Sequence, residues 1–189
     1  RFPAINAKCK EFGYGLTQEI PVAPAAHYSV GGVLSNNNGR TDIKRLYVCG
    51  EVAATGIMGA NRLASNSLIE CLVFANRAIE DSVKEGPIKD FPLFEAQYER
   101  NEHNAQMYTD IRAKASEIMN LYAGIIRTEE GLKEGLRQID ELERAITACE
   151  SHDKEYYIEA SRRLLCVARL IMSPALLRKE SRGGHYRED

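Results

Sequence analysis

The sequence predicts an α+β chain in which an α/β part is followed by an antiparallel three-helix bundle. Strand-like and helix-like patterns alternate up to about residue 85, whereas strand patterns are absent afterwards. Glycine and proline punctuate the chain between about residues 85 and 93. Three amphipathic stretches joined by short links then follow, which is typical of an antiparallel bundle. We therefore expect one part at residues 1–85 and a helical C-terminal domain at residues 86–189.

The elements of the first part are assigned from local patterns. A helix is expected over residues 3–12, because Pro3 suits the first helical turn. Residues 27–34 and residues 45–49 are predicted to be strands, since both runs are rich in β-branched, aromatic or other apolar residues. Residues 35–40 (SNNNGR) are expected to form a hairpin turn between them, because Asn and Gly tolerate positive φ.

A long helix is expected from about Ser67. Ser67 and Glu70 have the spacing of a capping box, in which the two side chains satisfy backbone amides at the helix start. The positive end of the helix dipole would then lie at Ser67. The apolar stripe expected to face the core consists of Leu68, Leu72, Ala75 and Ile79.

Three helices are expected in the helical domain. The first spans about residues 94–123, the second follows Thr128 as its N-cap, and the third begins near Asp153. Pro174 is expected to kink or end the third helix. The expected core stripes are Met107, Ile111, Ala115, Ile118 and Tyr122, then Leu132, Leu136, Ile139, Leu142 and Ile146, then Tyr157, Ala160, Leu164, Ala168 and Ile171.

Composition excludes several classes of protein. With 25 basic and 27 acidic residues the net charge is -2, so neither nucleic acid nor an anionic membrane surface is an expected partner. No apolar run approaches the roughly 20 residues that span a bilayer. The five cysteines are scattered without a C-x-x-C pair, which argues against a disulfide framework and a zinc site. A reducing, cytoplasmic location is therefore expected, with no metal.

The densest run of small and polar residues is the segment at 50–67, GEVAATGIMGANRLASNS. Gly50 and Glu51 follow a predicted strand end, where α/β proteins commonly bind ligands, and a carboxylate there can accept the hydroxyls of a ribose. Gly56 and Gly59 would let the backbone run close to a flat ligand. The following helix start would stabilise negative charge on that ligand. The segment therefore predicts a binding site.

Several separated motifs identify a family. They are PAAHYSVGGV at 24–33, GEVAATG at 50–56, GANRLASNSL at 59–68, ECLVFANRA at 70–78 and ALLRKESRGGHYRED at 175–189. In order and spacing they resemble the flavoproteins of the succinate dehydrogenase, fumarate reductase and L-aspartate oxidase family. The likeness is strongest to the L-aspartate oxidases, and it is dense over residues 1–83. The resemblance implies that the first part is the C-terminal part of an FAD-binding domain.

The resemblance also implies roles for individual residues. It implies that Glu51 binds the adenosine ribose of FAD and that His27 and Arg62 bind the carboxylates of the substrate. A guanidinium suits that role because it binds a carboxylate bidentately and stays charged. Ser67 and Leu68 are expected at the flavin ring, and Asn66 is a further residue expected to bind the cofactor. Met58 stands where the oxidases are expected to have a histidine, and a thioether can neither donate a proton nor bind a carboxylate.

The likeness to the L-aspartate oxidases implies an oxidation of L-aspartate to iminoaspartate, the first step toward quinolinate and NAD, with oxygen or fumarate reoxidising the FAD. Quinolinate synthase is a further partner that the resemblance leaves open. Two alternatives remain at this point. One is a soluble fumarate reductase or succinate dehydrogenase flavoprotein, and the other is a non-catalytic helical binding module with a degenerate flavin fold.

Two family features are not found in this sequence. It contains no G-x-G-x-x-G motif, and it lacks the capping domain that supplies the family's proton-transferring arginine. The chain begins with Arg1, and we interpret it as a piece of a longer polypeptide. No catalytic residue is therefore expected in it, and the isolated piece is expected to be inactive. For the tail at 178–186, docking near the active site through Arg182 and His185 and a simple surface tail are both consistent with the sequence.

Overall fold

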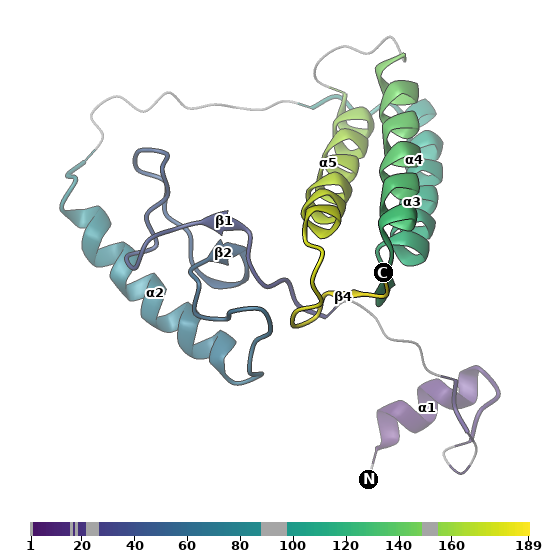
Figure 1. Ribbon diagram of the computed structural model, residues 1–189, viewed down its shortest axis with the longest axis horizontal. Helices are drawn as coiled ribbons and strands as arrows, with labels where there is room; N and C mark the ends of the chain where they lie inside the picture. The colour runs from purple at the N-terminus through teal and green to yellow at the C-terminus, as the bar shows by residue number, and fades with distance from the viewer. Residues whose placement is uncertain (1, 16, 18, 22–26, 88–97, 149–154) are drawn as a thin grey trace.

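The computed structural model describes residues 2–15, 17, 19–21, 27–87, 98–148 and 155–189. In Figure 1 the three long helices of the second half stand together, and the long helix of the first half lies with two short strands in a separate group. The elements are α1 (Pro3–Glu11), β1 (Val33–Leu34), the 3-10 helix η1 (Gly50–Val52), β2 (Ala53–Ala54), α2 (Asn66–Val83), α3 (Glu102–Tyr122), β3 (Ile126–Arg127), α4 (Glu129–Thr147), α5 (Tyr156–Leu177) and β4 (Tyr186–Arg187).

The strand predicted at 27–34 is wrong over most of its length. Only Val33 and Leu34 form a strand, β1, which pairs in parallel with β2 at Ala53 and Ala54. Gly31 and Gly32 precede it with φ of 104° and 153°, values that leave the extended backbone of a strand. The chain therefore enters β1 through an irregular segment.

The second predicted strand, at 45–49, is also wrong. Arg45 adopts a left-handed φ of 66°, and Tyr47 makes only an isolated bridge with Arg40. The Arg45 guanidinium donates to the carbonyls of Glu85 and Gly86 beyond the end of α2, a contact distant in sequence that local strand propensity does not report. A turn does form at 35–40, where the Asn36 side chain accepts hydrogen bonds from two backbone amides, but it does not join two strands as the predicted hairpin would.

Helix α2 buries a different face from the predicted one. Its buried residues are Glu70, Phe74 and Ala78, and it packs against η1. The predicted stripe is instead exposed, since Leu68, Leu72 and Ile79 are 63–68% exposed. The predicted capping box is wrong as well. Ser65 is the N-cap, without a side-chain capping bond, and the Glu70 carboxylate accepts a hydrogen bond from the hydroxyl of Thr55.

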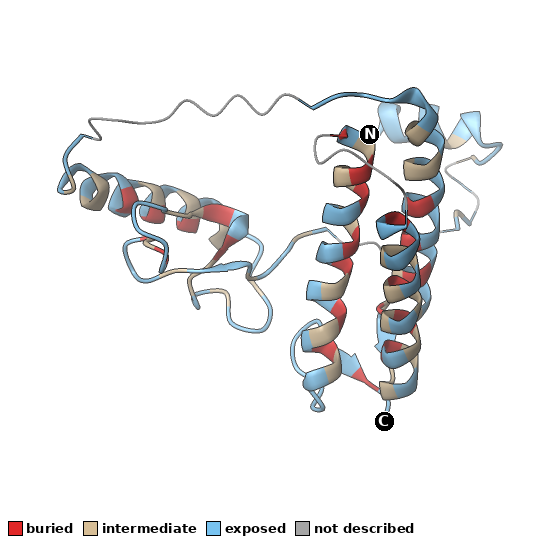
Figure 2. Cartoon of the chain, turned by 90° about the horizontal axis from the view of Figure 1, so that it is seen from above, coloured by how far each residue is buried: buried red, intermediate tan, exposed pale blue. Residues whose placement is uncertain are grey.

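Helices α3, α4 and α5 pack pairwise around one core, and their buried residues line the faces that they turn toward one another (Figure 2). The stripes predicted for the first two helices are confirmed. Thr128 also caps α4 as predicted, because its hydroxyl accepts from the amide of Gly131 at 3.1 Å. The core residues are Ile111, Ala115, Ile118, Ala123, Leu132, Ile139, Ile146, Ile158, Leu165, Ala168, Met172 and Ala175.

The predicted stripe of α5 is wrong in register. Of its members only Ala168 is buried, and the face around Ile158, Leu165 and Met172 is buried instead. Apolar residues surround much of this helix, so periodicity alone did not distinguish the two faces. The helix also continues through Pro174 to Leu177.

The start of α3 differs from the prediction. Helix α3 begins at Glu102 and not near residue 94, because the Asn101 side chain accepts from the amide of His103 and fixes the start there. The predicted residues 94–97 and the predicted start of the third helix at Asp153 lie outside the described residues. No helix in the described parts of the chain combines the length and the apolar character that crossing a membrane requires.

Candidate functional site

The side chain of Arg62 is held from two sides. Its Nη1 donates to the carbonyl of Ala64 at 2.9 Å and to Oγ of Ser67 at 3.1 Å. Its guanidinium carbon lies 3.6 Å from the ring centroid of Tyr28, so the planar cation is stacked on the ring. A guanidinium carries five N–H donors, and these contacts leave several of them for a ligand. The structure thus brings together two of the predicted site residues, Arg62 and Ser67.

Tyr28 is a member of this site that the sequence did not reveal. It is half-buried, and burial raises the pKa of its hydroxyl, with the Arg62 charge acting against burial and Glu51 adding to it. The phenol therefore remains neutral at neutral pH. The one available signal was its place beside His27, but an aromatic residue in a predicted strand is more readily interpreted as core.

His27 is exposed and precedes Tyr28 directly in the chain, which places its backbone one residue from the ring that carries Arg62. Glu51 is exposed in η1, and its Oε1 accepts a hydrogen bond of 2.7 Å from the amide of Ser29. This bond connects the 27–29 segment to η1, which leads directly into β2. The carboxylate predicted to bind ribose and the histidine predicted to bind substrate are thus joined by one short segment.

The start of α2 presents the other predicted residues. Leu68 is exposed, Ser67 is half-buried, and its hydroxyl donates to the carbonyl of Ala64. Asn66 is half-buried, and its backbone amide donates to the carbonyl of Leu63. Among the described residues no side chain caps this helix start at Ser65. The amides of the first turn therefore keep the capacity to bind a ligand.

A second missed contact fixes the loop in front of α2. Glu70 is 5% exposed, and its carboxylate accepts the hydroxyl hydrogen bond of Thr55. Glu70 also lines a cavity of about 210 Å³ on this face of the helix. The other residues around that cavity are Ile57, Asn66, Ile69, Val73 and Phe74. The hydrogen bond joins the segment after β2 to the first turns of α2.

Three glycines give this surface an open backbone. Gly31, Gly56 and Gly59 have φ of 104°, 84° and 58°, and a Cβ added at any of them would meet no atom within 4 Å. Glycine adopts such left-handed conformations without the steric cost that other residues meet. The backbone is therefore accessible to a flat ligand, as the sequence predicted for Gly56 and Gly59. Met58 lies between them half-buried, and its thioether supplies no hydrogen-bond donor.

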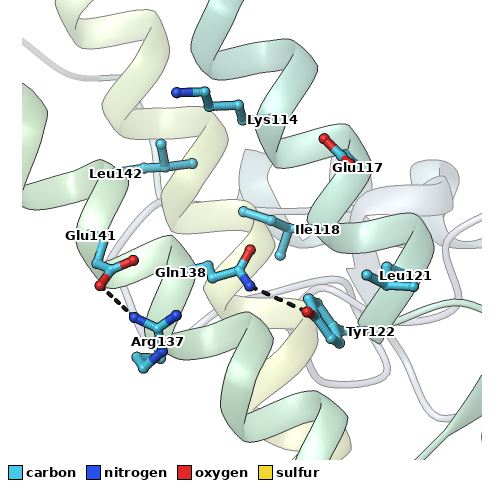
Figure 3. Close-up of a pocket in the computed structure, with 9 residues that line it drawn as sticks. All are labelled: Lys114, Glu117, Ile118, Leu121, Tyr122, Arg137, Gln138, Glu141 and Leu142. Atoms are coloured by element: carbon cyan, nitrogen blue, oxygen red, sulfur yellow. Dashed lines mark hydrogen bonds and ion pairs between the residues drawn. The ribbon is translucent and has the colours of Figure 1, made fainter.

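A larger cavity, of about 500 Å³, lies between α3 and α4 (Figure 3). At its rim Arg137 forms an ion pair with Glu141, which partly neutralises the charge there. Gln138 donates a hydrogen bond of 3.2 Å to the hydroxyl of Tyr122. None of the predicted site residues lines it. The lining residues are Lys114, Glu117, Ile118, Leu121, Tyr122, Arg137, Gln138, Glu141 and Leu142.

Two family models match this chain. The model described as an FAD binding domain matches residues 1–68, and the one described as the fumarate reductase flavoprotein C-term matches residues 112–189. The chain therefore carries part of an FAD-binding domain, and FAD is its cofactor. The residues present fit that cofactor, given the uncapped start of α2 and the open glycine backbone beside it.

Curated relatives agree over the whole chain. The chain is 39% identical to the chloroplastic L-aspartate oxidase of Oryza sativa, 38% to that of Streptomyces coelicolor and 40% to that of Yersinia pestis. Each alignment covers 100% of this chain and 32%, 35% and 36% of the respective relative. The chain thus spans about a third of the length of the curated relatives that it matches.

Solved structures share the fold. The match to a quinol fumarate reductase of E. coli has a TM-score of 0.78 at 29% identity and covers 100% of this chain and 36% of that one. The match to Sdh1 of Mycobacterium smegmatis has a TM-score of 0.77 at 26% identity and covers 100% and 35%. The chain therefore belongs to the fumarate reductase and succinate dehydrogenase flavoprotein family, and it corresponds to a C-terminal segment of the L-aspartate oxidases in that family.

Proposed function

We propose that a polypeptide containing this chain oxidises L-aspartate to iminoaspartate, the first step toward quinolinate and NAD. The observation that carries the proposal is the guanidinium of Arg62, which is held at the start of α2 by Ser67 and Tyr28 with several donors left for a substrate. The 38–40% identity to L-aspartate oxidases over the whole chain supports the choice of substrate. Oxygen or fumarate is the proposed acceptor.

In this proposal Arg62 and His27 hold the two carboxylates of L-aspartate. The guanidinium binds one carboxylate bidentately and stays charged at any working pH, and His27 donates a hydrogen bond to the other. Fixing both ends orients the α-carbon and so lowers the entropic part of the barrier. We assign no proton transfer to this chain and attribute it to an arginine in another segment of the polypeptide.

For the cofactor, we propose that Glu51 binds the ribose and that Asn66, Ser67 and Leu68 lie at the flavin ring. FAD, when bound, supplies the hydride acceptor for this oxidation. The uncapped amides of α2 and the positive end of its dipole would stabilise negative charge on the ring. Leu68, which is 68% exposed, would supply an apolar contact to it.

We also propose the division into residues 1–85 as the C-terminal part of the FAD-binding domain and residues 86–189 as a helical domain in the form of an antiparallel three-helix bundle. The two family models, which lie on either side of the boundary, support it. The exposed apolar face of α2, with Leu68, Leu72 and Ile79, supports an interface with the remainder of the FAD-binding domain. A cytoplasmic location and quinolinate synthase as a partner stay predictions.

A fumarate reductase or succinate dehydrogenase activity is the second candidate, because the solved structures reported above are of that kind. Their identities of 26–29% fall below the 38–40% of the oxidases. The two candidates are separated by anaerobic spectroscopy of the full-length protein purified with FAD. We expect L-aspartate to bleach the flavin absorbance. Bleaching by succinate and not by L-aspartate would make the second candidate correct.

Replacing Tyr28 by leucine is expected to raise the KM for L-aspartate roughly 10-fold, because a stacked cation–π contact contributes about 0.5–2 kcal/mol and directs the guanidinium. Tyr28→Phe keeps the ring and should leave the KM within about 2-fold. Steady-state kinetics of the full-length enzyme measure both. Equal losses in the two variants would mean that the hydroxyl, and not the stacking, holds Arg62.

A further inference from the structure

The last residues of the chain form a tight hairpin, which we call the C-terminal hairpin and define as residues 181–187. Arg182 and His185 exchange two backbone hydrogen bonds of 2.8 and 3.0 Å across its tip. At its base, Oγ of Ser181 accepts from the amide of Arg187 at 2.9 Å and donates to the same residue's carbonyl. The hairpin is therefore closed at both ends, and Gly183 and Gly184 form its tip.

The hairpin is attached firmly to the helical part of the molecule. Tyr186 and Arg187 pair in parallel with β3, the segment before α4. The His185 ring bridges two partners, with Nδ1 at 2.9 Å from Nη1 of Arg127 and Nε2 at 3.0 Å from the carbonyl of Arg178. The buried guanidinium of Arg187 adds bonds to the end of α5. The tip thus keeps a fixed position relative to α4 and α5.

The tip of the hairpin abuts the candidate site. A Cβ added to Gly183 would lie 2.0 Å from the carbonyl oxygen of Ala60 and 2.9 Å from its Cβ. These distances are far below van der Waals contact, so the two backbones touch directly and only a glycine fits. Ala60 stands two residues before Arg62, in the loop that leads into α2. Residues more than 120 positions apart in the sequence therefore meet at this point.

We propose that the C-terminal hairpin is a positioning element for substrate binding, which holds the loop that carries Arg62 through the Gly183–Ala60 contact. The inference rests on the proposed function for the role of Arg62. Two short hydrogen bonds and the Tyr28 ring aim the guanidinium, and all of them depend on where this loop runs. A displacement of about 1 Å is enough to weaken a positioned interaction strongly.

The experiment uses the full-length protein purified with FAD. We expect Gly183→Ala to raise the KM for L-aspartate and the calorimetric Kd for succinate, a non-reactive dicarboxylate, roughly 10-fold each. The Kd is read without turnover, and wild-type reduction by L-aspartate tests the proposed function separately. If the wild type oxidises succinate instead of L-aspartate, the proposed function fails. The test of the hairpin can still be made, with oxaloacetate in place of succinate as the dicarboxylate whose Kd is measured.

Two glycines serve as matched controls. Gly184→Ala changes the same tip, where an added Cβ would meet nothing within 4 Å. Gly86→Ala repeats the strain of a left-handed backbone, with φ of 68° against 60° for Gly183, at an open position. Both variants should keep the wild-type Kd. An unchanged Kd in Gly183→Ala, or an equal rise in either control, overturns the proposal.

A second variant decides the question if Gly183→Ala does not fold. Ser181→Ala removes the two bonds at the base of the hairpin without adding any bulk. We expect it to speed hydrogen exchange at residues 59–64 and to raise the Kd for the dicarboxylate about 3-fold. Unchanged exchange at residues 59–64 together with an unchanged Kd would show that the hairpin does not position this loop.

Discussion

Replacing Arg62 by leucine in the full-length enzyme is expected to raise the KM for L-aspartate about 100-fold or more. Leucine keeps part of the side-chain volume but loses the charge and all five donors. Removal of one partner of a buried, hydrogen-bonded charge pair costs about 2–5 kcal/mol, and a tenfold change corresponds to about 1.4 kcal/mol. The contacts to Ala64 and Ser67 are lost at the same time. Steady-state kinetics with L-aspartate as the varied substrate measure the change.

Two further variants interpret that result. Arg62→Lys keeps the charge but loses the planar fork and the stack on Tyr28, so it should fall between leucine and the wild type. Arg77→Leu removes an arginine from α2, the helix that follows the Arg62 loop, where its guanidinium donates to the carbonyl of Asn37, and should leave the KM unchanged. A KM that stays at the wild-type value in Arg62→Leu, or rises equally in Arg77→Leu, would contradict the role of Arg62 in carboxylate binding.

The core stripes predicted for α3 and α4 are confirmed because local sequence determines these helices, although α3 starts later than predicted. Asn101 and Thr128 cap their starts with their own side chains, and their apolar residues occupy one narrow stripe each. In α2 and α5 the apolar residues spread over more than one face, so the buried face depends on which segments pack there. The loop before α2, through Thr55, determines that Glu70 and Phe74 are buried while Leu68 and Leu72 are not.

The strands failed for a related reason. A strand is completed by a neighbour, and local β-propensity does not report which neighbours exist. Residues 27–34 and 45–49 have strand composition, yet two glycines and the left-handed Arg45 remove most of both runs from any ladder. The partner of β1 is Ala53–Ala54, a pair of small residues without a strand signal.

The candidate site shows the same division. Arg62 and Ser67 lie in one motif, so the sequence could bring them together before the structure was known. The stacking of Arg62 on Tyr28, the bond from Thr55 to Glu70 and the approach of Gly183 to Ala60 join segments distant in sequence. No local pattern reports contacts of this kind. The sequence therefore predicts which motif carries the site, and the structure shows what holds the arginine of that motif.

Replacing Arg187 by leucine is expected to lower the thermal unfolding midpoint of the full-length protein by about 5 °C or more. Arg187 is 7% exposed, and its guanidinium donates to the carbonyls of Ala175 and Arg178 at the end of α5 and to the carboxylate of Asp189. Leucine would leave these buried carbonyls without a donor, which is more costly than the loss of the bonds alone. In a cooperative unit of 150–250 residues each kcal/mol corresponds to roughly 2–4 °C.

The matched control for Arg187→Leu is Arg178→Leu, because Arg178 is exposed and pairs only with Glu180 among the described side chains. Its loss should move the midpoint by about 1 °C or less, since exposed ion pairs contribute little.

Acid gives a second test of the Arg187 contacts. The guanidinium of Arg187 holds the pKa of Asp189 below its ordinary value of 3.8, so the pair stabilises the fold above that pH and loses its contribution as the pH falls further. The gap between Arg187→Leu and wild-type midpoints should therefore narrow below about pH 4. An Arg178→Leu variant as unstable as Arg187→Leu would show that the buried guanidinium does not hold the end of α5. A gap that stays constant down to pH 2 would show that the pair with Asp189 does not contribute to stability.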